Sequence, residues 1–116
     1  ASPEELTLML YNGLIRFIMQ GQKAIEEKDI QKAHNSIIRA EDIILEFKST
    51  LDMQYEISKY LNALYDYMYD RLVEANLTKD TAILAEVLKI AKVLRDAWAE
   101  AMKIAKKESK VVQAAK

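Results

Sequence analysis

The residue types that most often form metal sites and nucleophiles are nearly absent from this chain. His34 is the only histidine, and there is no cysteine. A zinc site needs three or four ligands at set spacings, and a di-iron site in a helical bundle needs paired Glu-x-x-His motifs. Neither pattern occurs in the sequence. We therefore expect no metal site and no cofactor, and the lack of disulfides is compatible with a reducing, cytosolic setting.

The carboxylates and hydroxyls form no recognisable catalytic group. Asp66 and Asp70 lie one helical turn apart with Lys59 and Arg71 nearby, which is typical of a solvated face. Spacing alone leaves open a Ser or Thr nucleophile activated by His34, but no strand-turn-helix elbow would present one. No glycine-rich phosphate loop occurs either. We assign no catalytic residue and expect the protein not to be an enzyme.

The charge of the chain predicts neither a nucleic-acid nor a membrane partner. Lys and Arg number 17 and Asp and Glu number 18, so no global field attracts an anionic surface. Five lysines between Lys103 and Lys116 form a basic end, which we interpret as cations that favour a helix C-terminus. No apolar run approaches the roughly 18 residues of a membrane span, and no signal peptide opens the chain.

We expect the whole chain to be helical, because two glycines and one proline leave almost no helix breakers. Ser2, Pro3 and Glu5 form a helix start with a capping box. Apolar steps of three and four residues predict helices over residues 3–28, 30–51, 56–76 and 81–107, and Thr78 or Asp80 caps the last. Short connectors make this an all-α, antiparallel up-and-down four-helix bundle. We expect one domain over 1–116, with 108–116 as a frayed tail.

The core of such a bundle needs one apolar stripe from each helix. We expect Phe17 and Trp98 in this core, together with the first stripe of the first helix and the seams of the next two, which include Leu6, Leu10, Ala24, Ile30, Ile57, Leu61, Leu64, Met68 and Leu72. Many apolar residues are left over. A surplus spread over several helices usually marks an interface, because contiguous exposed apolar surface costs solubility.

The segment "LYDYMYDRL" alternates tyrosine with other residues at period two, which is also the pattern of a strand. On a helix, with about 100° per residue, the alternation separates into two stripes. We expect Tyr60 and Tyr67 to line a closed seam, and Tyr65 and Tyr69 to line the edge of an open groove.

Four segments together resemble a known family. They are "ASPEELTLMLYNGLIRFI" (1–18), "IIRAEDIILEFKSTLD" (37–52), "LYDYMYDRLVEAN" (64–76) and "LRDAW" (94–98). In this order and spacing they are similar to the FliS family, the flagellin-specific export chaperones of bacteria.

The resemblance implies a four-helix bundle that acts in the cytosol. Members of the family bind the helical C-terminal segment of new flagellin, prevent its premature polymerisation and assist its export through the flagellar type III secretion apparatus. Export-gate components are expected as further partners. In the family, a stretch upstream of the position of Ala1 can lie over part of the binding surface, and the present sequence does not include it.

The surplus apolar residues are the candidates for binding this client. They are Leu8, Tyr11, Ile15, Ile38, Leu45, Tyr65, Tyr69, Ile83 and Ile90. The alternative is a bundle with a structural or adaptor role that buries these residues by self-association and has no flagellin client.

Overall fold

The computed structural model describes residues 1–116 and contains four helices and no strand. Helix α1 covers Pro3–Glu26, α2 Ile30–Thr50, α3 Glu56–Thr78 and α4 Thr81–Ala115. The tyrosines of the alternating segment all lie within α3. The predictions of an all-α chain and of four helices are therefore confirmed.

The helix ends follow from local chemistry. The Ser2 Oγ accepts a hydrogen bond from the Glu5 amide at 3.2 Å, and the Asp80 carboxylate accepts one from the Ala82 amide at 2.8 Å. Each satisfies an amide that the first turn of a helix leaves unpaired. Lys28 and Lys79 adopt left-handed backbone conformations, with φ of 60° and 53°. This conformation stops a helix, so α1 ends at Glu26, and α3 continues to Thr78, past the predicted end at residue 76.

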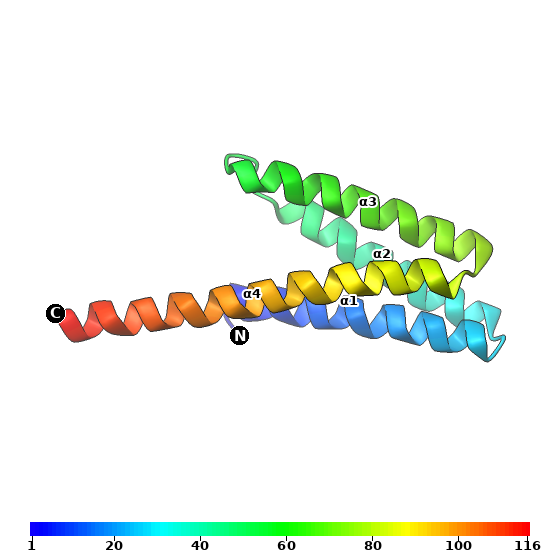
Figure 1. The fold of residues 1–116 in the computed structure, drawn as a ribbon, viewed down its shortest axis with the longest axis horizontal. Helices are drawn as coiled ribbons and strands as arrows, with labels where there is room; N and C mark the ends of the chain where they lie inside the picture. The colour runs from blue at the N-terminus through cyan, green and yellow to red at the C-terminus, as the bar shows by residue number, and fades with distance from the viewer.

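The helices form a ring in which each packs on two neighbours: α1 on α2 and α4, and α3 on α2 and α4. Consecutive helices run in opposite directions, which confirms the up-and-down bundle (Figure 1). Figure 1 also shows that α3 and α4 lie close at the connector that joins them and diverge toward the start of α3. The molecule is elongated, with extents of 59 × 27 × 20 Å.

The core draws on all four helices. Its largest fully buried side chains are Leu14, Ile18, Ile37, Ile44, Met68, Leu72, Leu84 and Val87. Burial of such side chains is the main favourable contribution to folding.

On α1 the structure corrects the predicted division into an inner and a surplus stripe. Leu14 and Ile18 are fully buried, whereas Leu6 is half exposed. At about 100° per residue, Leu14 lies between the two stripes, and Ile18 lies at the inner edge of the surplus stripe. The two stripes are therefore the flanks of one buried arc, and α1 has no separate second face.

Two further seam residues and two aromatic residues differ from expectation. Ile30 and Ile57 are exposed, because each lies in the first turn of its helix, at an end of the bundle. Phe17 and Trp98, expected in the core, are partly buried and pack against its edge.

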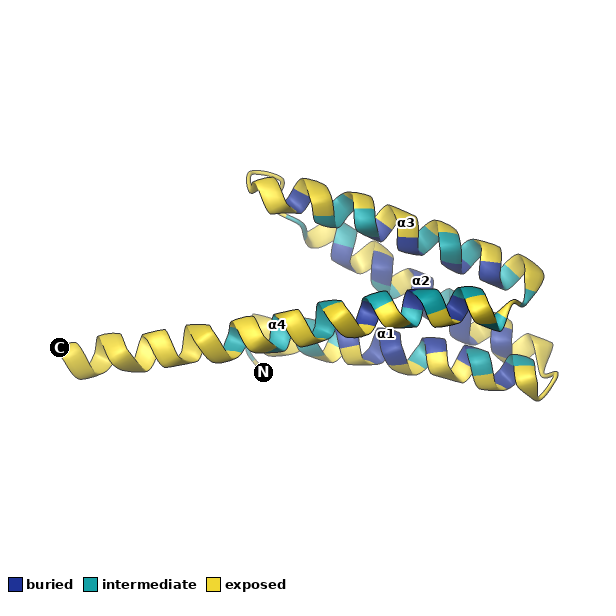
Figure 2. Cartoon of the chain, in the orientation of Figure 1, coloured by how far each residue is buried: buried dark blue, intermediate teal, exposed yellow.

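Helix α4 is longer than the sequence pattern predicted. It continues to Ala115, past the expected end at residue 107, so the segment expected to fray is helical. Every residue from Lys103 onward is exposed, and Figure 2 shows this end of α4 projecting beyond the other helices. Before this projection, the Trp98 indole donates a hydrogen bond of 3.0 Å to the Glu4 carbonyl on α1.

Candidate functional site

Three of the residues predicted to bind a partner belong to the core instead. Tyr11, Ile15 and Tyr65 are buried, and Tyr65 keeps only 3% of its surface exposed. The Tyr11 and Tyr65 hydroxyls are 2.8 Å apart and hydrogen-bonded. The Phe47 ring stacks on both, with ring centroids 4.4 Å from Tyr11 and 5.5 Å from Tyr65. These tyrosines join α1, α2 and α3, and no partner can reach them in this fold.

The tyrosines of α3 lie on the opposite sides from those predicted. Tyr60 is 75% exposed and Tyr67 is exposed, although both were expected in a closed seam. Tyr65 lies only about 40° around the helix from Leu61, at the centre of the buried face, whereas Tyr60 and Tyr67 lie about 100° and 120° away in the other direction. Tyr65 therefore enters the core, and Tyr60 and Tyr67 remain accessible.

The other six predicted residues are not fully buried, but they are spread over all four helices. Leu8 is half-buried beside α4, in a pocket of 540 Å³ that it shares with Met102. Ile38 lines a pocket of 380 Å³ between α2 and α3, and Leu45 is exposed two turns along α2 on the same side. Tyr69 is half-buried on α3 and packs against the core. Ile83 and Ile90 pack partly buried on α4. The structure does not unite these six side chains in one groove.

Tyr67 marks the seam between α3 and α4. Its hydroxyl donates a hydrogen bond of 2.7 Å to the Glu86 Oε2. The Arg71 Nε donates to the Glu86 Oε1, also at 2.7 Å. One carboxylate of α4 is therefore held by two side chains of α3. We call these three residues, Tyr67, Arg71 and Glu86, the Glu86 clamp.

The charges of the clamp change the acidity of its members. The hydrogen bonds from Tyr67 and Arg71 lower the pKa of Glu86, so this carboxylate stays ionised. The bond to Glu86 raises the pKa of Tyr67 and of Arg71. The clamp is therefore an ion pair between Arg71 and Glu86, and the neutral Tyr67 hydroxyl is an additional hydrogen-bond donor.

From Tyr67, which belongs to the clamp as well, exposed apolar side chains continue toward the start of α3 and lie on both helices. Ile57, Tyr60 and Tyr67 are exposed on α3, and Val93 is 62% exposed on α4. Ile90 lies one turn after Glu86 and is partly buried. We name these residues, Ile57, Tyr60, Tyr67, Ile90 and Val93, the α3/α4 strip.

The α3/α4 strip has an apolar base. Leu61, Leu64 and Leu94 are partly buried on the two helices and pack against the core cluster. Figure 1 shows that the helices diverge along this stretch, and Figure 2 shows intermediate and exposed residues along α3 there. Exposed apolar residues on neighbouring helices, above an apolar base, are typical of a surface that binds another protein segment.

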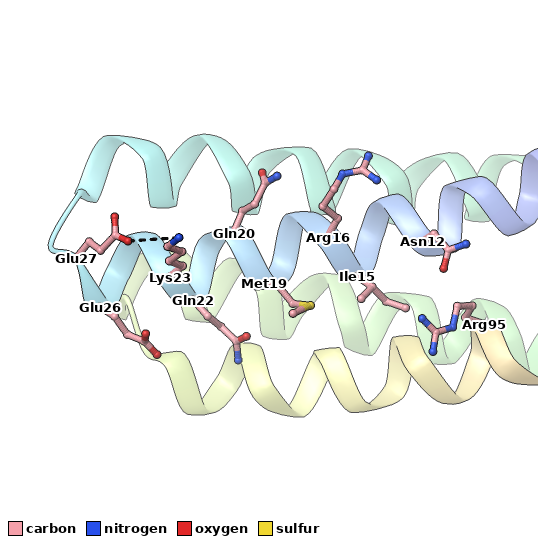
Figure 3. A pocket seen from close by; sticks show the side chains of 10 residues that line it. All are labelled: Asn12, Ile15, Arg16, Met19, Gln20, Gln22, Lys23, Glu26, Glu27 and Arg95. Atoms are coloured by element: carbon pink, nitrogen blue, oxygen red, sulfur yellow. Dashed lines mark ion pairs between the residues drawn. The ribbon is translucent and has the colours of Figure 1, made fainter.

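The largest of the three main pockets has a different character. Figure 3 shows this pocket of 740 Å³, which is lined by Asn12, Ile15, Arg16, Met19, Gln20, Gln22, Lys23, Glu26, Glu27 and Arg95. Only Ile15 and Met19 are apolar, and Lys23 pairs with Glu27 at 3.9 Å. A polar, solvated lining offers little apolar area to an amphipathic helix, so we do not assign it as the site.

The possible metal ligands of the chain lie apart from one another. No three His, Asp or Glu side chains are placed to hold a metal ion. The His34 Nδ1 lies 3.0 Å from the Asn76 side-chain nitrogen. None of the four helices combines the length and apolar character needed to cross a membrane.

The chain is similar to known proteins in both sequence and fold. The family model described as Flagellar protein FliS matches residues 1–105. A flagellar secretion chaperone FliS from Bacillus subtilis strain 168 is 45% identical over 93% of this chain and 81% of its own length. The flagellar secretion chaperone FliS of Escherichia coli strain K12 is 30% identical, over 88% and 77%.

A solved structure agrees with the fold. It is described as a crystal structure of flagellar chaperone from bacteria, and it aligns with a TM-score of 0.81 over 89% of this chain and 85% of its own. Its sequence identity is 18%, so this likeness concerns the fold alone. The family model and the sequence relatives carry the assignment: the chain belongs to the FliS family of flagellar secretion chaperones.

Proposed function

We propose that this protein is a cytosolic chaperone that binds the C-terminal segment of flagellin, prevents its premature polymerisation and assists its export. The observation that carries the proposal is the α3/α4 strip, an uncovered apolar surface in a member of a flagellar secretion chaperone family.

The physical requirement for such a client suits this surface. A segment that is disordered when free gains helical structure only if its apolar face is buried, and an apolar surface between two helices provides that burial. The ordering of the segment reduces the net affinity, so the client must cover a large area. The exposed residues of the α3/α4 strip provide part of that area. The partly buried Leu61 and Leu94 provide the apolar base beneath them.

Handover to the export apparatus completes the proposed role. No nucleotide site is required, because release follows when a further partner, such as a component of the export gate, takes the client. The relatives named flagellar secretion chaperone support this part of the proposal.

Calorimetry and far-UV circular dichroism with a flagellin C-terminal peptide test the proposal. We expect binding at about 1:1 with a gain of helix signal. Val93→Glu places a charge in the strip, and an unpaired charge buried in an interface is costly, so affinity should fall about tenfold or more.

Met9→Glu is the matched control. Met9 lies on α1 outside the strip and is 62% exposed, the same fraction as Val93. Both variants should keep the fold, and only Val93→Glu should lose the peptide. Equal binding by the two variants would show that the client uses another surface.

Self-association is the second candidate, because a second copy could also cover the strip. Sedimentation at low micromolar concentration separates the two. A stable dimer that gives no heat with the peptide would favour the structural role and contradict the chaperone.

A further inference from the structure

Glu41 is a buried carboxylate without a partner. Only 6% of its surface is exposed. It forms no ion pair and no side-chain hydrogen bond, whereas every fully buried side-chain nitrogen or oxygen in the molecule has a partner. The Glu41 oxygens are therefore not sealed in the core and must reach solvent. Since ionised groups at this depth are normally paired, the missing partner requires an explanation.

The opening is the pocket of 380 Å³ between α2 and α3. Glu41 lines it together with the apolar side chains of Ile38, Val73 and Leu77. Leu77 is 77% exposed and stands at its rim. The pocket therefore combines an apolar wall with one acidic group, and His34, Asn76 and Lys79 complete its lining.

The two basic residues in the lining, His34 and Lys79, both contact Asn76 and neither pairs with Glu41. Lys79 lies 2.6 Å from the Asn76 side-chain oxygen. The Asn76 side-chain nitrogen lies 3.0 Å from the His34 Nδ1, and the two side chains are hydrogen-bonded. Asn76 thus holds both His34 and Lys79, and Glu41 is left free.

The chemistry of the lining selects one class of ligand. A neutral apolar group would leave the carboxylate buried and unpaired, and an anion would be repelled. A metal ion would need further acidic or imidazole ligands, and no such cluster exists here. A cation on an apolar stem satisfies both parts of the pocket, because its stem packs on the wall and its charge pairs with the carboxylate.

Arginine fits these requirements better than lysine. Its planar guanidinium donates two parallel hydrogen bonds to one carboxylate, and it is less strongly hydrated than an ammonium. We propose that the pocket between α2 and α3 binds an arginine side chain of a protein partner, with Glu41 as its counter-ion and Ile38, Val73 and Leu77 around its stem.

The electrostatic environment of Glu41 agrees with an incomplete site. Burial raises the pKa of Glu41, the neighbouring Asp42 raises it further, and His34 lowers it in part. A guanidinium would lower this pKa, because it favours the ionised carboxylate.

This inference does not depend on the proposed function. The pocket lies between α2 and α3, whereas the α3/α4 strip lies on another side of α3. A chain that fails to bind flagellin peptide could still bind arginine here, and the reverse also holds.

The test uses N-acetyl-arginine amide as the probe and N-acetyl-citrulline amide as its neutral analogue. Methyl NMR of Ile38, Val73 and Leu77 follows the titration. The arginine probe should shift these signals saturably, and the citrulline probe should bind about tenfold more weakly or not at all. Equal affinities for the two probes would mean that the guanidinium charge contributes nothing to binding, and this result would overturn the proposal.

Glu41→Gln and Asp42→Asn form a matched pair, since each removes one negative charge at adjacent positions. Asp42 is exposed. Glu41→Gln should lose about tenfold or more in affinity, and Asp42→Asn should stay within about twofold. Equal losses would indicate a diffuse negative field and contradict a counter-ion role.

A second variant keeps the test valid if Glu41→Gln fails to fold. Leu77→Ala alters only an exposed residue of the rim, and it should weaken arginine binding about twofold to fivefold through lost stem contact. Unchanged binding by Leu77→Ala would place the probe elsewhere.

Discussion

Tyr11, Phe47 and Tyr65 show how side chains join helices whose backbones do not pack directly on each other. Helices α1 and α3 lie diagonally across the ring and share no backbone packing, yet the hydroxyls of Tyr11 and Tyr65 meet at 2.8 Å. Burial raises the pKa of both tyrosines, so both stay neutral and can share one proton donor between them. The pair forms a polar contact within an otherwise apolar core.

A double-mutant cycle tests this contact. Tyr11→Phe or Tyr65→Phe alone leaves one hydroxyl buried without a partner, and should cost about 1–3 kcal/mol of unfolding free energy. The double variant removes both hydroxyls, so its cost should be clearly smaller than the sum of the two. Urea denaturation followed by circular dichroism measures all four chains. Strict additivity would mean that the hydroxyls do not interact.

Tyr65 also shows the limit of a sequence pattern. The pattern correctly placed the tyrosines on a helix and divided them into two stripes. It predicted the wrong stripe to be exposed, because both stripes flank the same apolar ridge. The angle between Tyr65 and Leu61 was available from the sequence and would have corrected this assignment.

At the scale of the helix, the two glycines of α1 differ in what surrounds them. A Cβ on Gly13 would meet the Ile43 Cδ1 at 3.5 Å, an ordinary contact. A Cβ on Gly21 would lie 3.3 Å from the Ile37 Cγ1 and 3.5 Å from the Leu84 Cδ1. Gly21 therefore allows α1 to approach both α2 and α4 closely.

These contacts predict unequal effects of the same substitution. Alanine favours a helix interior over glycine by about 1 kcal/mol. Gly13→Ala should raise the unfolding free energy by about 0.5–1 kcal/mol, and Gly21→Ala should gain less because of crowding against Ile37. Urea denaturation of the two variants gives the comparison. A larger gain in unfolding free energy for Gly21→Ala would mean that Ile37 on α2 moves readily to accommodate the added methyl group.

The helices themselves were largely predictable. Ser2 and Asp80 cap α1 and α4 as the sequence indicated, and the four helices start within one residue of their expected positions. The end of α4 was missed, because the prediction relied on loss of apolar periodicity after Ala105. No glycine or proline follows this position, so nothing in the local sequence stops the helix.

At the scale of the whole molecule, the bundle is held at one end and open at the other. The Glu86 clamp links α3 to α4 on the side where they share a connector, and the α3/α4 strip begins where they diverge (Figure 1). Divergence of this kind depends on the packing of all four helices. The sequence indicated surplus apolar residues, but it could not show which pair of helices would leave them uncovered.

The clamp should make the α3–α4 seam sensitive to acid. The pKa of Glu86 in the folded protein is lower than its ordinary value of 4.5. Its stabilisation is therefore complete above that value and is lost as pH falls through the lowered pKa. Glu86→Gln should be less stable than the parent at pH 7 and should lose less stability on acidification from pH 7.

Thermal melts across this pH range measure the effect, with Glu41→Gln as a contrast. Burial raises the pKa of Glu41, so its ionised form destabilises the fold as pH rises above 4.5. Glu41→Gln should therefore be at least as stable as the parent at pH 7. The same response from both variants would mean that the two carboxylates have similar environments.

Trp98 is the only tryptophan in the chain, and it lies where α4 leaves the support of α1. Its indole donates to the carbonyl of Glu4, one residue after the start of α1. The tryptophan fluorescence of the chain therefore comes from this single junction. Detachment of the first turn of α1 would change the emission before the bundle melts, which gives the protein an intrinsic optical probe of local fraying that is separate from global unfolding.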